Sequence, residues 1–541
     1  MSSTKKLLST TNLKKYFPIP KKSIFQREQL YIRANEEITI DIHSGETFGL
    51  VGESGCGKST LGRTILQLYP QTAGSTLYYG RTLEEIAPSY VARTLKNAPQ
   101  MIAGYKKLFA KAETLVKACE TAGENATFYQ HQQKNLAVAE AETAFRNVVS
   151  ILGGFAALDD CREGAKALLD RFITAARISR LKQRMRDLDG EVAFCEALAN
   201  EIRADGSIKR AEAKIRKAAA RAGALTEKKQ RLRPELDKLE AILRDDTARL
   251  ESLRSRYAGN EDFARYEAML DPGIDLSRLK YKEMRILRKD IQIIFQDPYS
   301  SLNPRMTVGQ IIGEGLVTHG VFKPGDPQMK AYILDVMNQC GLQDHMLHRY
   351  PHQFSGGQRQ RISIARALAV KPKFIVCDEC VSALDVSIQS QIINLLEELK
   401  EKEHLTYLFI SHDLSVVRHI SDRIGVMYLG NLVELGSAEE VFGDPRHPYT
   451  VALLSSIPTT DAQSLKKERI ILEGNIPSPI KPPEGCKFHT RCYMAQDKCR
   501  RVPPELLEIT PGHYAACHFP EKKLDDNGGH LFRFPGKQGG E

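Results

Sequence analysis

Short apolar runs, each ended by glycine or by acidic residues, occur at both ends of the chain and predict buried β-strands. Three of them are ETFGLVG at 46–52, FIVCDE at 374–379 and TYLFISHD at 406–413. Bounded apolar runs of about four to eight residues are typical of strands in the middle of a sheet. After the first run, KSTLGRTILQLY at 58–69 has apolar residues at helical spacing. Alternating strands and helices therefore indicate an α/β fold for 30–80 and again for 276–441.

The region between about 82 and 271 has a different pattern, in which alanine, leucine, lysine, arginine and glutamate predominate. These are strong helix formers, and the apolar residues alternate three and four positions apart, as in a coiled coil. The apolar positions are Leu181, Met185, Leu188, Val192, Cys195, Ala199 and Ile202 in one run, and Leu232, Leu236, Leu239, Leu243, Leu250, Leu253 and Tyr257 in another. Asp246 interrupts the second run and should weaken it locally. We predict antiparallel helical hairpins that bring both ends of the region together, with breaks at Gly153–Gly154 and near Asp205.

The composition fits a soluble globular chain of two to four domains, since 42% of its 541 residues are hydrophobic and 27% are charged. No run of about eighteen apolar residues is present that could span a bilayer, and the N-terminus lacks the apolar segment of a secretory signal. We therefore expect a cytoplasmic protein that reaches a membrane only through a partner. The net charge of +10 is diffuse, which favours solvated helix faces over a nucleic-acid or lipid surface.

The stretch GESGCGKST at 52–60 fits the pattern G-x-x-x-x-G-K-[ST] between a predicted strand and a predicted helix. Its glycines allow backbone N–H groups to turn inward and surround phosphate oxygens. Lys58 is expected to reach the β- and γ-phosphates, and the Ser59 hydroxyl is expected to ligate Mg²⁺. The predicted phosphate-binding residues are Gly52, Ser54, Gly55, Gly57, Lys58, Ser59 and Thr60. A glycine-rich turn that binds no nucleotide is the alternative.

An acidic pair follows the apolar run at 374–377. Asp378 is expected at the carboxyl end of its strand, where open α/β sheets bind ligands, and to hold Mg²⁺ through water. Glu379 comes next and can polarise the attacking water as a general base. The alternative is an exposed pair that only ends a strand, and the phosphate loop in the same chain argues against it.

The stretch FSGGQRQRISIARAL at 354–368 predicts a helix that begins with a serine cap. Ser355 and the N–H groups of Gly356 and Gly357 would form an anion site at the helix N-terminus. Taken alone, this motif is better explained as an ordinary capped helix. His412 follows a predicted strand directly and lies where a contact to the γ-phosphate is needed.

These motifs, with Gln296 in IFQDPYSSLNP and Asp385 in SALD, resemble those of the ATP-binding cassette (ABC) ATPases and occur once each in the same order. The stretch 52–60 resembles Walker A, and Gln296 resembles the Q-loop glutamine. The signature is resembled by Ser355, Gly356, Gly357 and Gln358, and Walker B by Asp378 and Glu379. Asp385 resembles the D-loop residue and His412 the H-loop residue. The resemblance implies a P-loop NTPase fold with an α-helical subdomain, ATP and Mg²⁺ as cofactors, and catalysis by Glu379, His412 and Gln296. It also implies that Ser59, Gln296 and Asp378 surround Mg²⁺. Either Phe17 or Tyr16 would stack on adenine.

By the same resemblance, one cassette does not complete its own site. Two cassettes pack head to tail, so that ATP on one Walker A contacts the signature of the other, and hydrolysis opens the dimer. Two positions depart from the family pattern: Cys380 stands where proline is usual after the Walker B glutamate, and Phe354 replaces the more common leucine before the signature serine. Cys380 loosens one backbone torsion but removes no catalytic group.

A narrower resemblance is to the F-type ATPases of bacterial oligopeptide/dipeptide importers. It rests on 49–66, 294–312 and 350–368, and on RHPYTVALLSSIP at 446–458 and LEGNIPSPIKPPEGCKFHTRC at 472–492. It covers about 8–80 and 276–520. It implies an ATPase on the cytoplasmic face of the membrane that contacts a transmembrane permease through the groove at 296–304. The other implied partners are a second ATPase subunit, either a sister or a second copy, and indirectly an extracytoplasmic solute-binding protein. No nucleic acid is expected.

The implied organisation is a nucleotide-binding domain at 1–81 and 275–445, a helical insertion at 82–274, a C-terminal extension at 446–520 and a disordered tail at 521–541. The alternative function is a soluble coiled-coil ABC ATPase that acts on DNA, because such proteins also interrupt the cassette with a coiled coil. Their insertions are usually longer and follow the Q-loop, whereas this one precedes it. A translation-factor ABC protein would carry two cassettes in one chain.

Four cysteines lie close together in the C-terminal extension: Cys486, Cys492, Cys499 and Cys517. Their spacing, C-x5-C-x6-C-x17-C, is not the short spacing of structural zinc sites. Four thiolates also hold [4Fe–4S] clusters, and the importer resemblance implies such a cluster in some members. A cluster, a zinc ion and thiols without metal remain open. The neighbouring His489, His513 and His518 are expected to be exposed.

Overall fold

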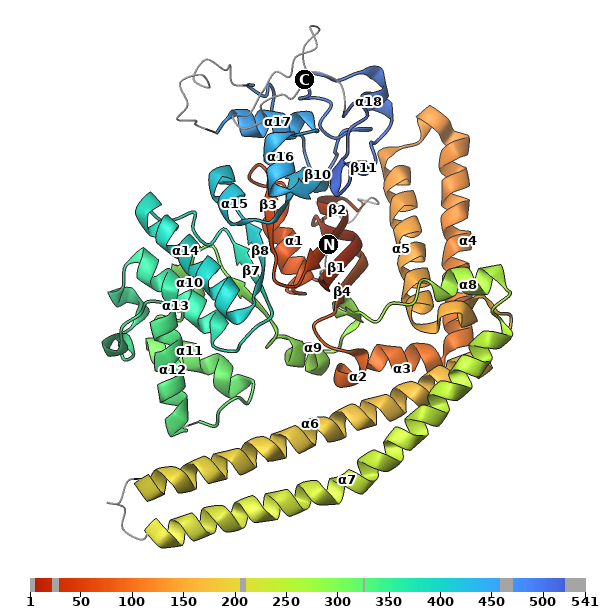
Figure 1. The fold of residues 1–541 in the computed structure, drawn as a ribbon. Helices are drawn as coiled ribbons and strands as arrows, with labels where there is room; N and C mark the ends of the chain where they lie inside the picture. Colours follow the sequence, from red (N-terminus) through yellow and green to blue (C-terminus); the bar gives the residue numbers. More distant parts are fainter. Residues whose placement is uncertain (1–4, 22–28, 205–210, 325, 458–469, 521–541) are drawn as a thin grey trace, which may run out of the picture.

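The computed structural model describes residues 5–21, 29–204, 211–324, 326–457 and 470–520. Two β-sheets form the centre of the molecule, and helices surround them on several sides (Figure 1). The C-terminal extension covers one end of the sheets, and a long helical hairpin projects beneath them in this view. The predicted break near Asp205 and the predicted disorder at 521–541 lie outside the described residues.

The larger sheet has eight strands and carries most of the chemistry. Its strand order is β11 (Leu507–Thr510), β12 (His513–Ala515), β10 (Asn431–Ser437), β9 (Arg423–Tyr428), β3 (Thr47–Val51), β8 (Thr406–Ile410), β7 (Phe374–Asp378) and β6 (Ile291–Ile294). Strands β9, β3, β8, β7 and β6 pair in parallel. Every residue of β3, β7 and β8 is buried, as their apolar runs predict. The predicted α/β P-loop fold class is confirmed.

The smaller sheet is antiparallel, in the order β2 (Tyr31–His43), β1 (Lys6–Pro18), β4 (Ala73–Tyr78) and β5 (Ile274–Asp275). Helix α1 (Lys58–Ile65) lies between the two sheets, because Leu61 and Ile65 share one apolar core with residues of both. A Cβ on Gly62 would lie 2.9 Å from side-chain carbons of both Ile410 and Val376. Glycine at this position therefore allows the phosphate-loop helix to approach the larger sheet closely.

Further helices flank the larger sheet (Figure 1). The chain that connects β6 to β7 forms a separate group of helices. The group between these strands consists of α10 (Pro298–Ser301), α11 (Val308–Thr318), α12 (Pro327–Gln339) and α13 (Gly356–Leu368). The other helices of this part are α9 (Tyr281–Leu287), α14 (Val386–Glu403), α15 (Leu414–Ile420), α16 (Ala438–Gly443), α17 (Pro448–Ser455) and α18 (Asp497–Arg501). The apolar faces of α11–α17 pack with the larger sheet in one continuous core, whereas Met284 and Leu287 of α9 belong to the core that contains α1.

The residues between β4 and β5 are almost entirely helical. They form α2 (Leu83–Ile86), α3 (Ser89–Lys96), α4 (Ala98–Ala122), α5 (Phe128–Leu152), α6 (Arg162–Ala204), α7 (Ala211–Arg256) and α8 (Glu261–Glu267). Strand β5 pairs directly with β4, with Leu77 opposite Asp275 and Tyr78 opposite Ile274. The chain therefore returns to the strand from which it left, and the cassette on either side of the helices stays continuous.

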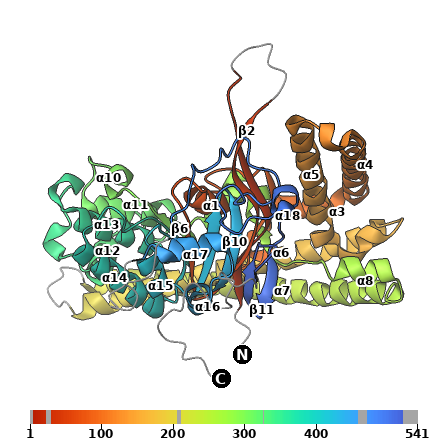
Figure 2. The same cartoon turned by 90° about the horizontal axis from the view of Figure 1, so that it is seen from above.

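Helices α6 and α7 pack against each other as the longest hairpin of the molecule (Figures 1 and 2). Of the heptad residues named above, eight are buried and the others are half-buried; the buried ones are Leu188, Cys195, Ala199, Ile202, Leu236, Leu239, Leu250 and Leu253. Asp246 accepts a hydrogen bond of 3.0 Å from the Thr174 hydroxyl, so the polar interruption is satisfied within the hairpin. A 3₁₀ segment at Gly153–Ala157 separates α5 from α6, at the glycine pair where a break was predicted.

Shortening this hairpin should leave the ATP hydrolysis that the motifs predict unchanged within about twofold, because exposed surface segments tolerate deletion. The variant removes 188–230 and joins Asp187 to Arg231 through a short glycine-serine turn. It keeps the interhelical pair of Lys182 and Glu240, whose Nζ–Oε1 distance is 2.8 Å. The measurement is steady-state ATP turnover against the full-length chain. A tenfold loss of turnover in a folded variant would show that the tip acts on the site.

Candidate functional site

A cavity of about 340 Å³ brings together residues from widely separated parts of the chain. It is lined by Phe17, Ile32, Arg33, Ala34, Ser54, Gly55, Cys56, Gly57, Lys58, Ser59, Thr60, Gln296, Glu379, Leu429, Gly430 and Pro479. The phosphate loop, the Q-loop glutamine and the Walker B glutamate therefore share one space. The helices inserted between β4 and β5 do not disrupt this arrangement, because their ends meet at paired strands.

The phosphate loop turns sharply between β3 and α1. Gly57 has a φ of +106°, and a Cβ there would lie 2.1 Å from the carbonyl oxygen of Ala34. Only glycine fits this combination of backbone conformation and close approach. The Asn35 side chain donates a 3.1 Å hydrogen bond to the Gly57 carbonyl and fixes the turn from the other side. The loop is thus held in the conformation that the motif predicts.

Lys58 is buried at the start of α1, with 4% of its surface exposed. Its Nζ donates to the carbonyl oxygens of Gly52 at 2.7 Å and of Glu53 at 3.1 Å. The ammonium therefore lies across the concave side of the loop, where phosphate oxygens bind in sites of this shape.

Asp378 is fully buried at the carboxyl end of β7. Its Oδ2 accepts hydrogen bonds from Nε and Nη2 of Arg63, at 3.2 and 3.1 Å, whereas its Oδ1 has no hydrogen-bond partner within the described part of the chain. A buried carboxylate oxygen without a donor is suited to a metal-bound water. The Mg²⁺ role predicted for Asp378 fits this oxygen. The Arg63 contact was not predicted, although its place in the last turn of α1 was visible in the sequence.

Glu379 lies next to the two other residues predicted to be catalytic, Gln296 and His412. Its Oε2 accepts a 2.6 Å hydrogen bond from Gln296 Nε2, and its Oε1 lies 3.6 Å from Nδ1 of His412. The backbone of Glu379 is left-handed, with a φ of +49°, and its N–H donates to the Ile410 carbonyl at 2.9 Å. A left-handed non-glycine residue costs about 1–2 kcal/mol, so the surrounding structure imposes the orientation of this carboxylate.

The two aromatic candidates for adenine stacking occupy different environments. Tyr16 is buried, its hydroxyl donates to Glu36, and burial raises its pKa far above the ordinary value. Phe17 lines the cavity, with the Lys15 Nζ 4.5 Å from its ring centroid and Tyr69 at its edge. Of the two rings, Phe17 is the one placed beside the phosphate loop.

The signature residues lie at the start of α13 and do not line the cavity. Ser355 caps the helix, since its Oγ accepts from the Gln358 N–H at 3.3 Å. Asp385 caps α14 in the same way, with its Oδ1 3.1 Å from the Ile388 N–H. Ser355 and Gly356 are exposed, while Gly357 and Gln358 are half-buried. The predicted signature residues therefore lie on a part of the surface separate from the phosphate loop.

The C-terminal extension contributes to the site in ways that its sequence did not indicate. The carbonyl oxygen of Pro479, which lines the cavity, accepts a 3.2 Å hydrogen bond from the Arg33 N–H. Glu434 on β10 is fully buried and accepts from the N–H groups of Arg446 and His447, which fixes the start of the HPYT segment. These contacts could not be predicted, because the extension is irregular, far from its partners in the sequence, and without a periodic pattern of apolar residues.

His513 corrects one expectation. It is 1% exposed, and its Nε2 lies 2.8 Å from Oε1 of Glu434. It is therefore buried and hydrogen-bonded to Glu434 in the extended sheet, and the expectation of an exposed histidine is wrong for this residue. His489 and His518 are less enclosed, and each contacts a backbone carbonyl, of Cys486 and of Val502 respectively.

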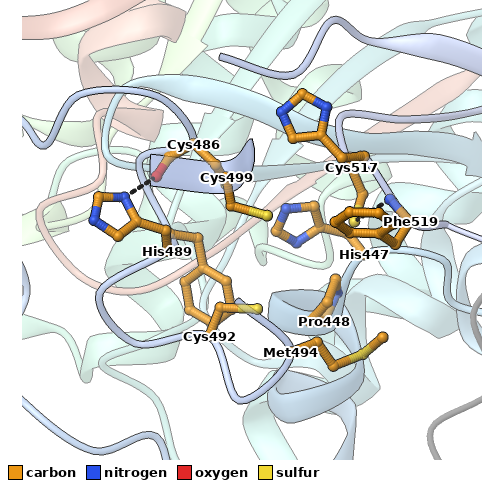
Figure 3. A pocket seen from close by; sticks show the side chains of 11 residues that line it. His447, Pro448, Cys486, His489, Cys492, Met494, Cys499, Cys517 and Phe519 are labelled. Carbon is orange, nitrogen blue, oxygen red and sulfur yellow. Dashed lines mark hydrogen bonds between the residues drawn. The ribbon is translucent and has the colours of Figure 1, made fainter. Parts of the chain in front are cut away.

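The four C-terminal cysteines line a single cavity of about 20 Å³, together with His447 and Met494 (Figure 3). Burial raises the pKa of Cys492 to about 12 and that of Cys517 to about 11. All eleven cysteines lie in the described ranges, and none forms a disulfide. Within those ranges, no group of three or more His, Cys, Asp or Glu side chains is arranged to hold a single metal ion.

The fold and the cavity together define the class of protein. A phosphate loop, a Walker B pair at a parallel strand end and a capped signature helix on one chain are the parts of an ATP-binding cassette. A family model described as ABC transporter matches 35–188 and 258–382. A second, described as Oligopeptide/dipeptide transporter, C-terminal region, matches 433–499.

The chain belongs to the ABC transporter family of ATP-binding proteins. It is 54% identical over 252 residues to the oligopeptide transport ATP-binding protein AppF of Bacillus subtilis, covering 46% of this chain and 76% of AppF. It is 50% identical over 248 residues to the oligopeptide transport ATP-binding protein OppF of Haemophilus influenzae, covering 45% of this chain and 74% of OppF. The predicted family is confirmed, and the chain is an ABC-type ATPase that uses ATP and Mg²⁺ as this family does. Among the helices described, none is both long and apolar enough to cross a membrane.

Proposed function

We propose that the chain is the ATP-hydrolysing, energy-coupling subunit of a bacterial importer of oligopeptides or dipeptides. The observation that carries this proposal is the match of 433–499 to the C-terminal region of oligopeptide/dipeptide transporters. This region forms part of the folded cassette: Ala515 of β12 pairs with Glu434 of β10, and Pro479 lines the ATP cavity. A chain that acts on DNA would need no such extension, so the importer is favoured over that alternative.

The residues of the cavity divide the chemistry among them. Lys58 and the loop N–H groups bind the β- and γ-phosphates. Ser59, Gln296 and the free Oδ1 of Asp378 would hold Mg²⁺, which neutralises charge on the phosphates when it is bound. Glu379 takes a proton from the attacking water as general base, Gln296 orients its carboxylate, and His412 contacts the γ-phosphate.

The signature of a second cassette completes the site. Ser355, Gly356, Gly357 and Gln358 lie on the surface helix α13, where they can contact ATP held by a partner and not by their own chain. ATP binding thus stabilises a closed head-to-tail dimer, and hydrolysis removes the bridging phosphate. This cycle moves a transmembrane permease that docks in the groove at 296–304 on the cytoplasmic face of the membrane. A solute-binding protein delivers the peptide from outside.

The proposal is tested by reconstituting the chain with a permease, a sister ATPase and a solute-binding protein of an oligopeptide importer. We expect ATP turnover in liposomes to rise when peptide-loaded binding protein is added. The matched control omits the peptide. The proposal would be overturned if ATP turnover were the same with and without the permease and were stimulated by DNA.

Phe17→Ala should weaken ATP binding about tenfold, because stacking of an aromatic ring on a base contributes about 1–3 kcal/mol. Phe17→Trp is the matched control, since it retains a stacking surface and should stay within about threefold of the wild type. Both are measured by calorimetric titration with ATP. Unchanged affinity in Phe17→Ala would show that another group holds the adenine.

We further propose that the four cysteines bind a [4Fe–4S] cluster. Four thiols that line one cavity are the donor set that such a cluster requires. Anaerobic purification should give about four irons per chain and a visible charge-transfer absorbance, both lost in Cys492→Ser. Iron-free protein, or one zinc per chain, would exclude the cluster.

A further inference from the structure

A bidentate ion pair joins the C-terminal extension to the phosphate loop. Nη1 of Arg491 lies 2.8 Å from Oε2 of Glu53, and Nη2 lies 3.0 Å from Oε1. Glu53 stands between Gly52 and Ser54, within the loop itself, whereas Arg491 is 438 residues further along the chain. The side chains are 7% and 24% exposed for Arg491 and Glu53, so water only partly screens the pair.

A second contact fixes the backbone at the same point. The Glu53 N–H donates a 2.8 Å hydrogen bond to the Tyr449 hydroxyl. The Tyr449 ring packs against Tyr428 and Phe488, with centroids 4.8 and 5.4 Å apart. Tyr449 and Phe488 are fully buried and belong to the same extension as Arg491. Both the backbone and the side chain of Glu53 are therefore held by residues outside the P-loop motif.

An uncompensated carboxylate in this loop would oppose ATP binding. Glu53 is one residue from Ser54, which lines the cavity, and a triphosphate carries several negative charges. Like charges repel each other, and water screens this repulsion less in a partly buried site than at an exposed surface. A bidentate guanidinium both neutralises the carboxylate and fixes its direction. The carboxylate is turned toward Arg491 and does not line the cavity.

We propose that Arg491 is a positioning residue of the ATP site: by pairing with Glu53, it neutralises a negative charge in the phosphate loop and fixes the direction of that side chain. The inference rests on the proposed function, since it assumes that the cavity binds ATP. It assigns to the C-terminal extension a direct part in setting ATP affinity. Arg491 immediately precedes Cys492, so the loop that lines the cysteine cavity also positions the guanidinium.

The test compares ATP affinities of full-length variants by calorimetric titration. Arg491→Gln should raise the dissociation constant about tenfold, and this loss should shrink as salt is added, because the cause is charge repulsion. Adding Glu53→Gln to the same chain should restore affinity to within about threefold of the wild type. A residue that merely supported folding would not be rescued by removing the acid. The inference is overturned if Arg491→Gln binds ATP as tightly as the wild type, or if the double variant binds as weakly as the single one.

Arg491→Lys covers the case in which Arg491→Gln fails to fold. It retains the charge and loses the bidentate geometry, so its affinity should fall by about threefold. A tenfold or greater loss in a folded Arg491→Lys protein would contradict charge neutralisation. If the wild-type chain itself does not bind ATP, the proposed function fails. If it binds ATP and the variants do not differ from it, only this inference fails.

Discussion

Glu379→Gln should lower ATP turnover by about 10²–10⁴-fold while leaving ATP binding within about threefold of the wild type, because it removes the base but not the phosphate contacts. The substitution preserves the shape of the side chain and an oxygen that can accept the hydrogen bond from Gln296 Nε2. ATP should then accumulate in the closed head-to-tail dimer. The measurements are turnover and the mass of the complex in the presence of ATP.

Glu398→Gln is the matched control for this experiment. Glu398 is exposed on α14, outside the cavity, and loses the same charge without touching the site. Its turnover should remain within about twofold of the wild type. Normal hydrolysis by Glu379→Gln would show that another group is the base. If this variant stays monomeric in the presence of ATP, an ATP site shared between two cassettes is contradicted.

Lys58→Met should weaken ATP binding by about a hundredfold or more. Charge-assisted hydrogen bonds contribute about 1.5–3 kcal/mol each, and an ammonium that contacts two phosphates makes at least two of them. Methionine keeps the length and the apolar stem of the buried lysine, so the helix should still fold. Calorimetric titration with ATP checks the affinity, and the unfolding midpoint checks the fold.

Lys96→Met is the corresponding control, because Lys96 is exposed in the last turn of α3 and lies outside the cavity. Its ATP affinity should equal that of the wild type within about twofold. Lys58→Met protein that binds ATP at wild-type strength would contradict the role assigned to the phosphate loop.

Local patterns predicted the centre of the molecule because the same residues that bury the strands also place the chemistry. The apolar run of β7 is wholly buried, so Asp378 necessarily emerges at its end. The resemblance to ABC ATPases implied that Gln296 and Glu379 belong to one site, and a 2.6 Å hydrogen bond joins them. Heptad spacing likewise identified Leu236 and Leu239, which pack with Ile178 across the α6–α7 hairpin.

The contacts that sequence could not predict involve residues without a periodic setting. Arg491 and Pro479 lie in irregular chain, and their partners Glu53 and Arg33 are more than four hundred residues away. The choice between Tyr16 and Phe17 depended on which face of β1 each side chain occupies, and register shifts in that strand hide the alternation. His513 looked like a polar tail residue, because nothing nearby in the sequence indicates that Glu434 is its partner.

The pairing of β4 with β5 has a consequence for how such a protein can change. The entry and exit points of the inserted helices are neighbouring strands, about 4.8 Å apart. A folded unit whose termini lie side by side can be accommodated at such a junction. The position can therefore accept other folded domains, and a fluorescent protein inserted there would label the ATPase.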